Sequence, residues 1–162
     1  MLKINRKVEY ALMTLKYMLD KGEGKLSSAR EICDSFKTPF DTTAKVMQVL
    51  NHKGILVSVK GVKGGYSVAS DLSQITYLQL CEMLEGPSSI PQCTSSPKSC
   101  DLYATCNIIT PLHKLGQKIM NVLGEVTLVE LLQNSPTLDF EIKSHREENQ
   151  ATQVNIQQSS SQ

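Results

Sequence analysis

The fold is decided by residues 28–66, which read SAREICDSFKTPFDTTAKVMQVLNHKGILVSVKGVKGGY. Ser28, with a glutamate three residues later, has the pattern of a capping box, which predicts a helix over residues 29–36. A short turn follows, after which Asp41 can cap a second helix over residues 42–53. The stretch therefore begins with two predicted helices joined by a tight turn.

The remainder of this stretch has the pattern of β-strands. Residues 55–59 are rich in β-branched side chains, and residues 66–69 form a second short candidate strand. Between them lies the basic, glycine-rich segment 60–65, which is typical of a hairpin turn. Two helices joined by a tight turn and followed by a hairpin predict a winged helix–turn–helix.

Amphipathic helices are predicted on both sides of this unit. Apolar residues at helical spacing over residues 8–19 predict a helix that ends near Gly22. In the helix over residues 29–36, we expect Ile32 and Phe36 to face the core. Three more helices are predicted, and they cover residues 77–84, residues 110–123 and a short stretch after Thr127. The expected fold class is mainly α with a small β-hairpin, in which a winged helix–turn–helix domain is followed by a long helix.

The composition divides the chain into four parts. Residues 1–85 hold the winged helix–turn–helix, residues 86–106 a cysteine loop, and residues 107–140 the long helix and a short C-terminal helix. Residues 141–162 are rich in Glu, Asn, Gln and Ser, which cannot bury enough apolar surface to become ordered. We therefore expect a disordered polar tail there.

The size and hydrophobic pattern exclude some classes of protein. The chain has 162 residues, of which 40% are hydrophobic, enough for one modest core. No stretch reaches the roughly 18 apolar residues of a membrane span. The first residues lack the apolar core of a secretory signal. A membrane or secreted protein is therefore not expected, and the expected location is the cytoplasm.

The net charge of +1 hides an asymmetry between the two parts of the chain. Residues 1–70 carry a net charge of +6, and residues 71–162 carry a net charge of −5. A basic half favours contact with a polyanion. Combined with the winged-helix pattern, this indicates double-stranded DNA, with the second helix of the pair in the major groove.

The candidate DNA contacts lie on the outward face of that helix and on the hairpin turn. Lysine and glutamine side chains can bond base edges, and alanine can touch a thymine methyl group. A glycine-rich turn can approach the groove closely because glycine has no side chain. The candidates are Thr42, Ala44, Lys45, Gln48, Lys60, Lys63 and Gly64. The rival interpretation is a helix–turn–helix that never touches DNA, with a basic hairpin that is only a solvated turn.

Three of the five cysteines, Cys93, Cys100 and Cys106, lie close together in the loop 86–106. Such a long loop needs something other than a core to order it, and a thiolate-bound metal centre would do so. Structural zinc sites usually use closely spaced cysteine pairs, which are absent here. Iron–sulfur clusters accept wider spacings, and we expect three thiolates and one weaker ligand. The alternative is a loop whose thiols are incidental.

The remaining two cysteines, Cys33 and Cys81, fall within predicted helices. A lone helical cysteine usually behaves as a small buried hydrophobic residue. Neither is therefore expected to be a metal ligand.

Taken together, these features resemble a family of bacterial winged-helix transcription regulators that includes IscR, NsrR, RirA and CymR. The resemblance covers about residues 1–135. It is carried by residues 7–11 (KVEYA), the hairpin 57–66 (VSVKGVKGGY), the three clustered cysteines and residues 127–131 (TLVEL).

The resemblance implies a homodimer, in which the long helix from about Thr110 to Leu123 is the dimerisation helix. It also implies binding to a pseudo-palindromic operator, with an affinity set by the state of a two-iron or four-iron cluster. The signal would be redox state, nitric oxide or iron status, and the regulator would be a repressor or an activator.

For the fourth ligand, the resemblance offers two positions. A histidine three residues after the last cysteine is the ligand in one branch of the family, but Ile109 stands at that position here. In another branch, an acid on the first helix reaches across from the partner subunit, and the matching residue is Glu9. Glu9 is therefore the first candidate, and His113 is the second.

Two rival functions remain open. One is a winged-helix DNA-binding regulator whose thiols form a zinc or disulfide switch. The family also has members without these cysteines, which sense other signals, so the three thiols matter to the assignment. The other is an iron–sulfur electron-transfer protein, which would give the basic hairpin no role. An enzyme is not expected, because no nucleophile–base pair, phosphate-binding loop or pair of carboxylates stands out in the sequence.

Overall fold

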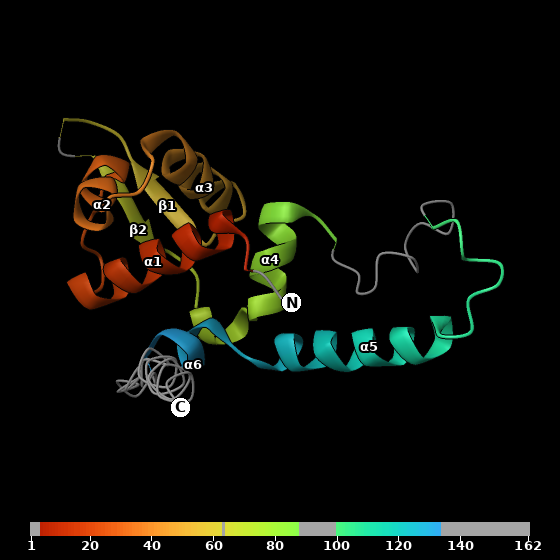
Figure 1. Cartoon of the computed structure of the whole chain (residues 1–162). Coiled ribbons are helices and arrows are strands. Elements are labelled where there is room, and N and C mark those ends of the chain that lie inside the picture. The colour runs from red at the N-terminus through yellow and green to blue at the C-terminus, as the bar shows by residue number, and fades with distance from the viewer. Residues whose placement is uncertain (1–3, 63, 88–99, 134–162) are drawn as a thin grey trace, which may run out of the picture.

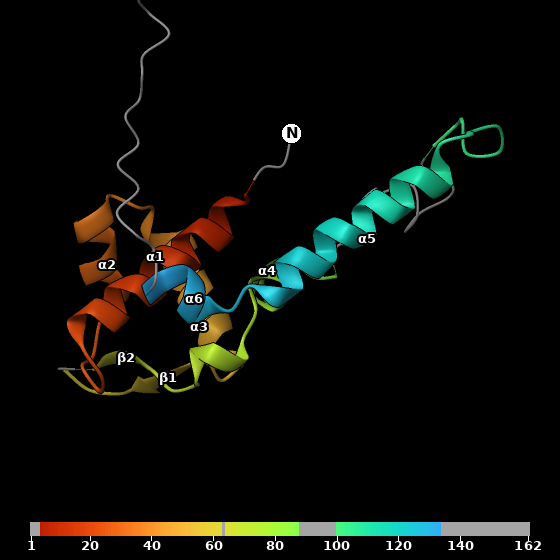
Figure 2. The same ribbon diagram turned by 90° about the horizontal axis from the view of Figure 1, so that it is seen from below.

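The structure, a computed structural model, describes residues 4–62, 64–87 and 100–133. Its elements are α1 (Arg6–Lys21), α2 (Ala29–Phe36), α3 (Phe40–His52), β1 (Leu56–Val59), β2 (Gly65–Val68), the short 3₁₀ helix η1 (Leu72–Gln74), α4 (Tyr77–Glu85), α5 (Ile109–Glu125) and α6 (Leu128–Gln133). The predicted fold class is confirmed: the described part is mainly helical with one two-stranded antiparallel hairpin, in the order of a winged helix–turn–helix. Figures 1 and 2 show α5 extending away from a body that contains the other elements.

Capping boxes are present at α2, where one was predicted, and at α4, and both helices begin at the predicted residues, 29 and 77. At α2, the Ser28 hydroxyl accepts the backbone N–H of Glu31 at 3.1 Å, and the Glu31 carboxylate accepts the N–H of Ser28. At α4, Thr76 and Gln79 make the same pair of bonds, at 3.2 and 2.9 Å. These signals are local, and four residues are enough to specify them.

The predicted start of α3 is wrong by two residues. The helix begins at Phe40, and the N-cap is Pro39, which makes no side-chain capping bond. Asp41 is therefore not the cap but an acid in the first turn, where the helix dipole stabilises it. The physical reason is Pro39: its fixed φ of −64° leads into the helix, and its carbonyl accepts the N–H of Thr43 at 3.0 Å.

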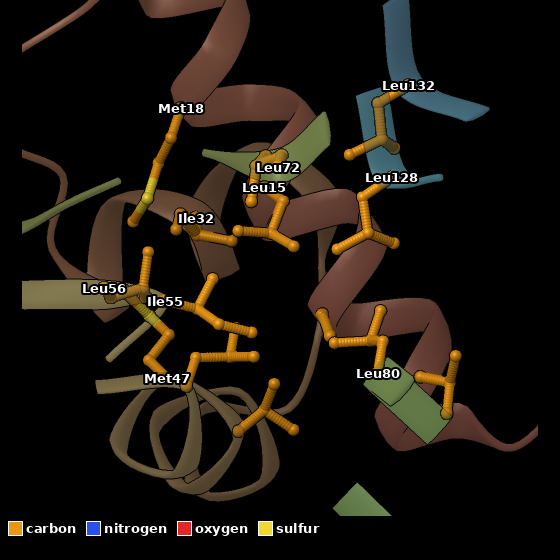
Figure 3. Packing of buried hydrophobic residues seen from close by; sticks show 14 residues of the cluster. Leu15, Met18, Ile32, Met47, Ile55, Leu56, Leu72, Leu80, Leu128 and Leu132 are labelled. Atoms are coloured by element: carbon orange, nitrogen blue, oxygen red, sulfur yellow. The ribbon is translucent and has the colours of Figure 1, made fainter. Parts of the chain in front are cut away.

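The core collects apolar side chains from nearly every element of the body (Figure 3). α1 lies at its centre and contacts α3, α4, α6 and β2. Ile32 is buried as predicted, but Phe36 is not, because it lies at the last position of α2 and is 38% exposed. Its ring instead meets the Tyr17 ring edge-on, with the two centroids 5.8 Å apart.

Two single-pair backbone bridges close the body. Ser27 pairs with Tyr66 of β2, which ties the residue before the N-cap of α2 to the hairpin. Thr76 pairs with Thr127, so that the start of α4 and the start of α6 are joined. The segment 77–126 therefore begins and ends at the same place on the body.

Among the described helices, none is both long enough and apolar enough to cross a membrane.

Candidate functional site

α3, the helix predicted to lie in the major groove, presents a polar face outward and an apolar face to the core. Val46 and Leu50 are buried, whereas Lys45 and Gln48 are exposed. Of the other α3 residues predicted to contact DNA, Thr42 and Ala44 are half-buried. The four predicted contacts on this helix therefore lie on one side of it, as the helical period requires.

A groove of about 760 Å³ runs along this exposed face, between α3, α4 and the start of α1. Its apolar lining includes Val49 of α3 and Met83 of α4. Its polar lining is basic and contains no acid: Thr42, Lys45, Gln48, His52, Lys53 and Lys7. The predicted DNA-binding face is thus continuous with a cationic groove, which attracts an anionic backbone.

The hairpin forms a wing whose tip needs glycine at two positions. β1 and β2 pair in the register Leu56 with Val68 through Val59 with Gly65. Gly61 has φ +122°, a conformation that few other residues adopt. A Cβ on Gly64 would lie 2.8 Å from the Gly61 carbonyl oxygen and even closer to that of Val59. Gly64 is therefore required by the turn itself, whatever it contacts.

The basic side chains of the wing point to solvent where they are described. Lys60 is exposed, and so is its neighbour Val62. Lys63, the second predicted basic contact, lies outside the described residues.

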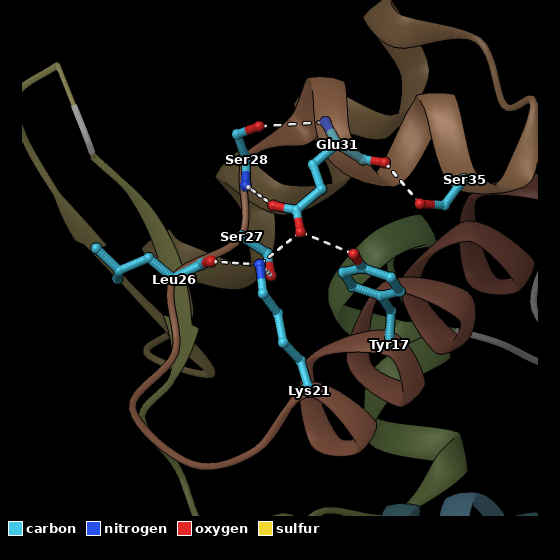
Figure 4. A network of polar contacts seen from close by, with 7 residues as sticks. All are labelled: Tyr17, Lys21, Leu26, Ser27, Ser28, Glu31 and Ser35. Atoms are coloured by element: carbon cyan, nitrogen blue, oxygen red, sulfur yellow. Dashed lines mark hydrogen bonds and ion pairs between the residues drawn. The ribbon is translucent and has the colours of Figure 1, made fainter.

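A polar network holds in place the segment 26–27, which pairs with the hairpin through Tyr66 (Figure 4). The Lys21 ammonium, at the end of α1, donates to the Leu26 carbonyl at 2.8 Å, to the Ser27 hydroxyl at 3.2 Å and to the Glu31 carboxylate. The Tyr17 hydroxyl donates to the same carboxylate at 2.7 Å. The hydrogen bond from Lys21, above all, holds the pKa of Glu31 below its ordinary value, although partial burial acts in the opposite direction.

Two of the three clustered cysteines are described, and they lie at the far end of α5. Cys100 and Cys106 are free, half-buried thiols in a run of turns that precedes the helix. The turns are closed by backbone bonds from Tyr103 to the Cys100 carbonyl and from Thr105 to the Leu102 carbonyl, both 3.1 Å long. Cys93 lies outside the described residues.

The predicted fourth ligands do not join these thiols within one chain. Glu9 is on the first turn of α1, where its carboxylate pairs with Arg6 at 2.9 Å, and both views show α1 well away from the segment 100–108 that precedes α5 (Figures 1 and 2). His113 is exposed on the first part of α5. Across residues 4–62, 64–87 and 100–133, no three His, Cys, Asp or Glu side chains gather as a metal site.

The two helical cysteines differ from each other. Cys33 is buried, as predicted, whereas Cys81 is only half-buried. Burial raises the pKa of the Cys81 thiol, and burial together with the Cys81 side chain raises the pKa of Tyr77 to about 12. Both groups therefore stay protonated at neutral pH, which makes Cys81 a poor nucleophile and a poor metal ligand.

The sequence model of the Rrf2 family, described as an iron-dependent transcriptional regulator, matches residues 4–134. The chain belongs to the Rrf2 family. A protein of Aquifex aeolicus (strain VF5), described as a "Putative HTH-type transcriptional regulator", is 30% identical over 127 residues, which are 77% of this chain and 88% of the relative. The regulator NsrR of Shouchella clausii (strain KSM-K16) is 24% identical over 131 residues, which are 80% of this chain and 88% of NsrR.

A solved structure shows the same fold. CymR, the global cysteine regulator of B. subtilis, superposes with a TM-score of 0.63 at 24% identity, over 84% of this chain and all of CymR. The chain is therefore a winged-helix, DNA-binding transcription regulator of the Rrf2 family, and the predicted resemblance is confirmed.

In this Rrf2 protein, α5 and its N-cap residue carry an apolar stripe that stays partly exposed on the single chain. Ile108, Leu115 and Val122 are 50%, 53% and 58% exposed and are seven residues apart. Leu112 and Ile119 fall between them, so that the spacing alternates between four and three residues. This is the heptad pattern by which two helices pack against each other.

Sequence reasoning missed the Lys21 network and the Ser27–Tyr66 bridge. Both depend on contacts between segments that are far apart in the sequence, and the periodicity within a helix or strand does not predict such contacts. The only signal was the run of polar residues between α1 and α2, which does not say where its carbonyl groups point.

Proposed function

We propose that this Rrf2-family regulator binds double-stranded DNA as a cytoplasmic homodimer, with an affinity controlled by an iron–sulfur cluster. The observation that carries the DNA contact is the exposed side of α3, where Lys45 and Gln48 continue into the basic groove. Thr42 and Ala44 complete this side, and Lys60, Lys63 and Gly64 form the contact at the wing. Side chains of these types suit base edges and phosphates.

The homodimer is supported by the stripe on α5. An apolar heptad seam that stays exposed on a single chain is stabilised when a second copy covers it. Two copies related by a two-fold axis would present two α3 helices to two half-sites, about 34 Å or a multiple of that apart. The operator would therefore be pseudo-palindromic.

The cluster is supported by the donor set. Three thiols lie within residues 93–106, and the two described ones are free and half-buried rather than packed in the core. The family description as iron-dependent agrees with this proposal. Cys93, Cys100 and Cys106 would hold the group, which supplies chemistry sensitive to oxidants and nitric oxide.

The arrangement of α1 and the segment before α5 indicates which subunit would supply the fourth ligand. Because α1, which carries Glu9, lies away from the segment 100–108 of its own chain, Glu9 would serve a second copy, as Glu9 of the partner subunit. Its carboxylate would then leave the ion pair with Arg6 and bind the metal instead. His113 of α5 is the runner-up, because it is exposed and follows Cys106 closely along the chain.

A thiol or zinc switch is the second candidate, and it is favoured by the free state of Cys100 and Cys106. The similarity to CymR, described as a global cysteine regulator, keeps this candidate open. The electron-transfer alternative receives no support from a chain that belongs to a family of transcription regulators.

The deciding experiment is purification without oxygen, followed by the visible spectrum and by iron, sulfide and zinc analysis. A brown protein with iron and sulfide that loses DNA affinity or gains it on exposure to nitric oxide supports the cluster. A protein that stays colourless after reconstitution contradicts it and leaves the thiol or zinc switch. Cys100→Ala should lose the colour, whereas Cys81→Ala, the matched control, should keep it.

A further inference from the structure

The first residue of α3 is a large apolar side chain that the core does not use. Phe40 is 48% exposed and lies outside the buried cluster. The guanidinium of Arg30, on α2, lies over its ring, 5.5 Å from the centroid. Arg30 is itself exposed, so this pair is a surface feature at the junction of the two helices.

The backbone beneath Phe40 is held firmly in place. Pro39 precedes it, and the Pro39 carbonyl accepts the N–H of Thr43. The buried Thr43 hydroxyl donates to the Thr38 hydroxyl at 2.9 Å, which ties the turn to the first turn of α3. The ring is therefore presented in one place, with little freedom left to lose on binding.

That place is the end of the helix that enters DNA. In a helix–turn–helix, the N-terminal residues of the recognition helix contact base edges in the major groove. The apolar group that the major groove offers is the 5-methyl of thymine, and phenylalanine is one of the side chains that contact it. Lys45 and Gln48, two of the exposed polar residues of α3, lie further along the helix, whereas the exposed Asp41 adjoins Phe40.

We propose that Phe40 contacts a thymine methyl group in each half-site and sets a preference for thymine there. Arg30 positions the ring through its cation–π contact and places a positive charge beside it for the adjacent phosphate. This inference rests on the proposed DNA binding and adds a specificity-determining residue that the polar pattern of α3 did not indicate.

The rival role for this pair is a clip that only holds α2 against α3. A clip would change stability, and it would change the affinity for all DNA sequences by the same factor. A base contact would change the affinity only where the thymine methyl is present.

The experiment uses the full-length protein in the cluster state that binds DNA more tightly. A duplex is first selected from a randomised pool with the wild-type protein. Each thymine of the half-site is then replaced in turn by deoxyuridine, which lacks only the methyl group. At one symmetric pair of positions, the wild-type Kd should rise about fourfold for each half-site, the effect of one buried methyl group.

The variants assign this effect to the ring. Phe40→Ala should bind the thymine and deoxyuridine duplexes equally, whereas Phe40→Leu should keep part of the preference. Phe36→Ala, the matched control that removes the other exposed phenylalanine of this region, should keep the full wild-type ratio. Arg30→Gln should weaken binding to both duplexes and lower the dependence on salt.

The outcomes separate this inference from the proposed function. If the wild-type protein selects a sequence but no thymine can be distinguished from deoxyuridine, or if Phe40→Ala keeps the wild-type ratio, Phe40 does not read the methyl group. If the wild-type protein selects no sequence in either cluster state, the proposed DNA binding is overturned as well.

Discussion

Ser27 and Tyr66 exchange two backbone hydrogen bonds: the Ser27 N–H donates to the Tyr66 carbonyl at 2.8 Å, and the Tyr66 N–H donates to the Ser27 carbonyl at 2.9 Å. Ser27, the residue before the N-cap of α2, thereby becomes a third strand position beside β2. The segment that leads into α2 is thus hydrogen-bonded to the hairpin. The helix–turn–helix and the wing are consequently parts of one rigid unit.

A methyl group at Gly65 should disturb this pairing. A Cβ there would lie 2.9 Å from the Ser27 carbonyl oxygen, and neither backbone can yield easily. Gly65→Ala should lower the free energy of unfolding by about 1–3 kcal/mol and weaken DNA binding. Denaturant unfolding and a DNA titration measure the two effects. Gly124→Ala is the control, because its Cβ would meet only Leu78 at 3.6 Å and the helix should be slightly more stable. An unaltered stability of Gly65→Ala would contradict the rigid pairing.

The wing charge should appear in the salt dependence of DNA binding. Lys60 is exposed at the end of β1, so Lys60→Ala should weaken binding to all sequences alike. For a dimer with two wings, the slope of log K against log salt should become shallower by about 2. Lys114→Ala removes the same charge from α5, away from the hairpin, and should leave the slope unchanged. Equal slopes for wild type and Lys60→Ala would refute the wing contact.

The apolar stripe on α5 should control the oligomeric state. Leu115→Glu puts a charge in the middle of the seam and should convert a dimer into monomers, because a carboxylate cannot be buried there without a partner. Light scattering or sedimentation measures the mass directly. Gln117→Glu introduces the same charge on the same helix outside the stripe, and this protein should remain a dimer. A Leu115→Glu protein that stays dimeric would place the interface elsewhere.

Two buried threonines should respond in opposite ways to the same substitution. The Thr14 hydroxyl has no hydrogen-bond partner in the described part of the chain, so Thr14→Val should stabilise the protein by about 1 kcal/mol. The Thr43 hydroxyl donates to Thr38, so Thr43→Val should destabilise it by about 1 kcal/mol. Thermal unfolding of the two variants gives the comparison. The prediction fails if both changes shift Tm in the same direction.

Acid should weaken the contact between α1 and α2 through Glu31. The pKa of Glu31 in the folded protein is lower than the ordinary value of 4.5, chiefly because of the hydrogen bond from Lys21. The folded state thus binds this proton less readily than the unfolded state, so the contribution to stability is full above pH 4.5 and is lost as the pH falls through the folded pKa. The Tm difference between wild type and Glu31→Gln should be constant above pH 5 or so and should shrink in acid. A difference that does not change with pH would contradict this role.

The parts of the fold that the sequence predicts well are those with short-range causes. The boundaries of α2 and the start of α4 follow from capping boxes, in which the donor and the acceptor are three residues apart. The start of α3 does not, because Asp41 and Pro39 both fit a helix start, and the sequence does not show that the Pro39 carbonyl accepts the N–H of Thr43. The helical period places Phe36 on the inward face of α2, but Phe36 is the last residue of the helix and lies at the edge of the core, where it stays partly exposed.

The candidate site divides in the same way. The polar face of α3 follows from the spacing of Val46 and Leu50, whereas the basic groove beside it also needs Lys7 and Met83 from distant segments. The candidate ligand Glu9 shows the limit most clearly. The resemblance to the family singles it out, but no sequence period shows that its helix, α1, lies away from the segment 100–108 of the same chain (Figure 1).

The Thr76–Thr127 bridge has a consequence for how such a protein can change. The Tyr77 N–H donates to the Val126 carbonyl and the Leu128 N–H to the Ile75 carbonyl, both at 2.8 Å, so that the ends of a 50-residue excursion are fastened together at the body. The segment between α4 and α5 can be lengthened, shortened or given different thiols without a change of the two attachment points, whereas α4 itself belongs to the body through its buried Leu80. One DNA-binding body can therefore be kept unchanged in evolution while the segment between α4 and α5 is replaced by one with a different sensing chemistry.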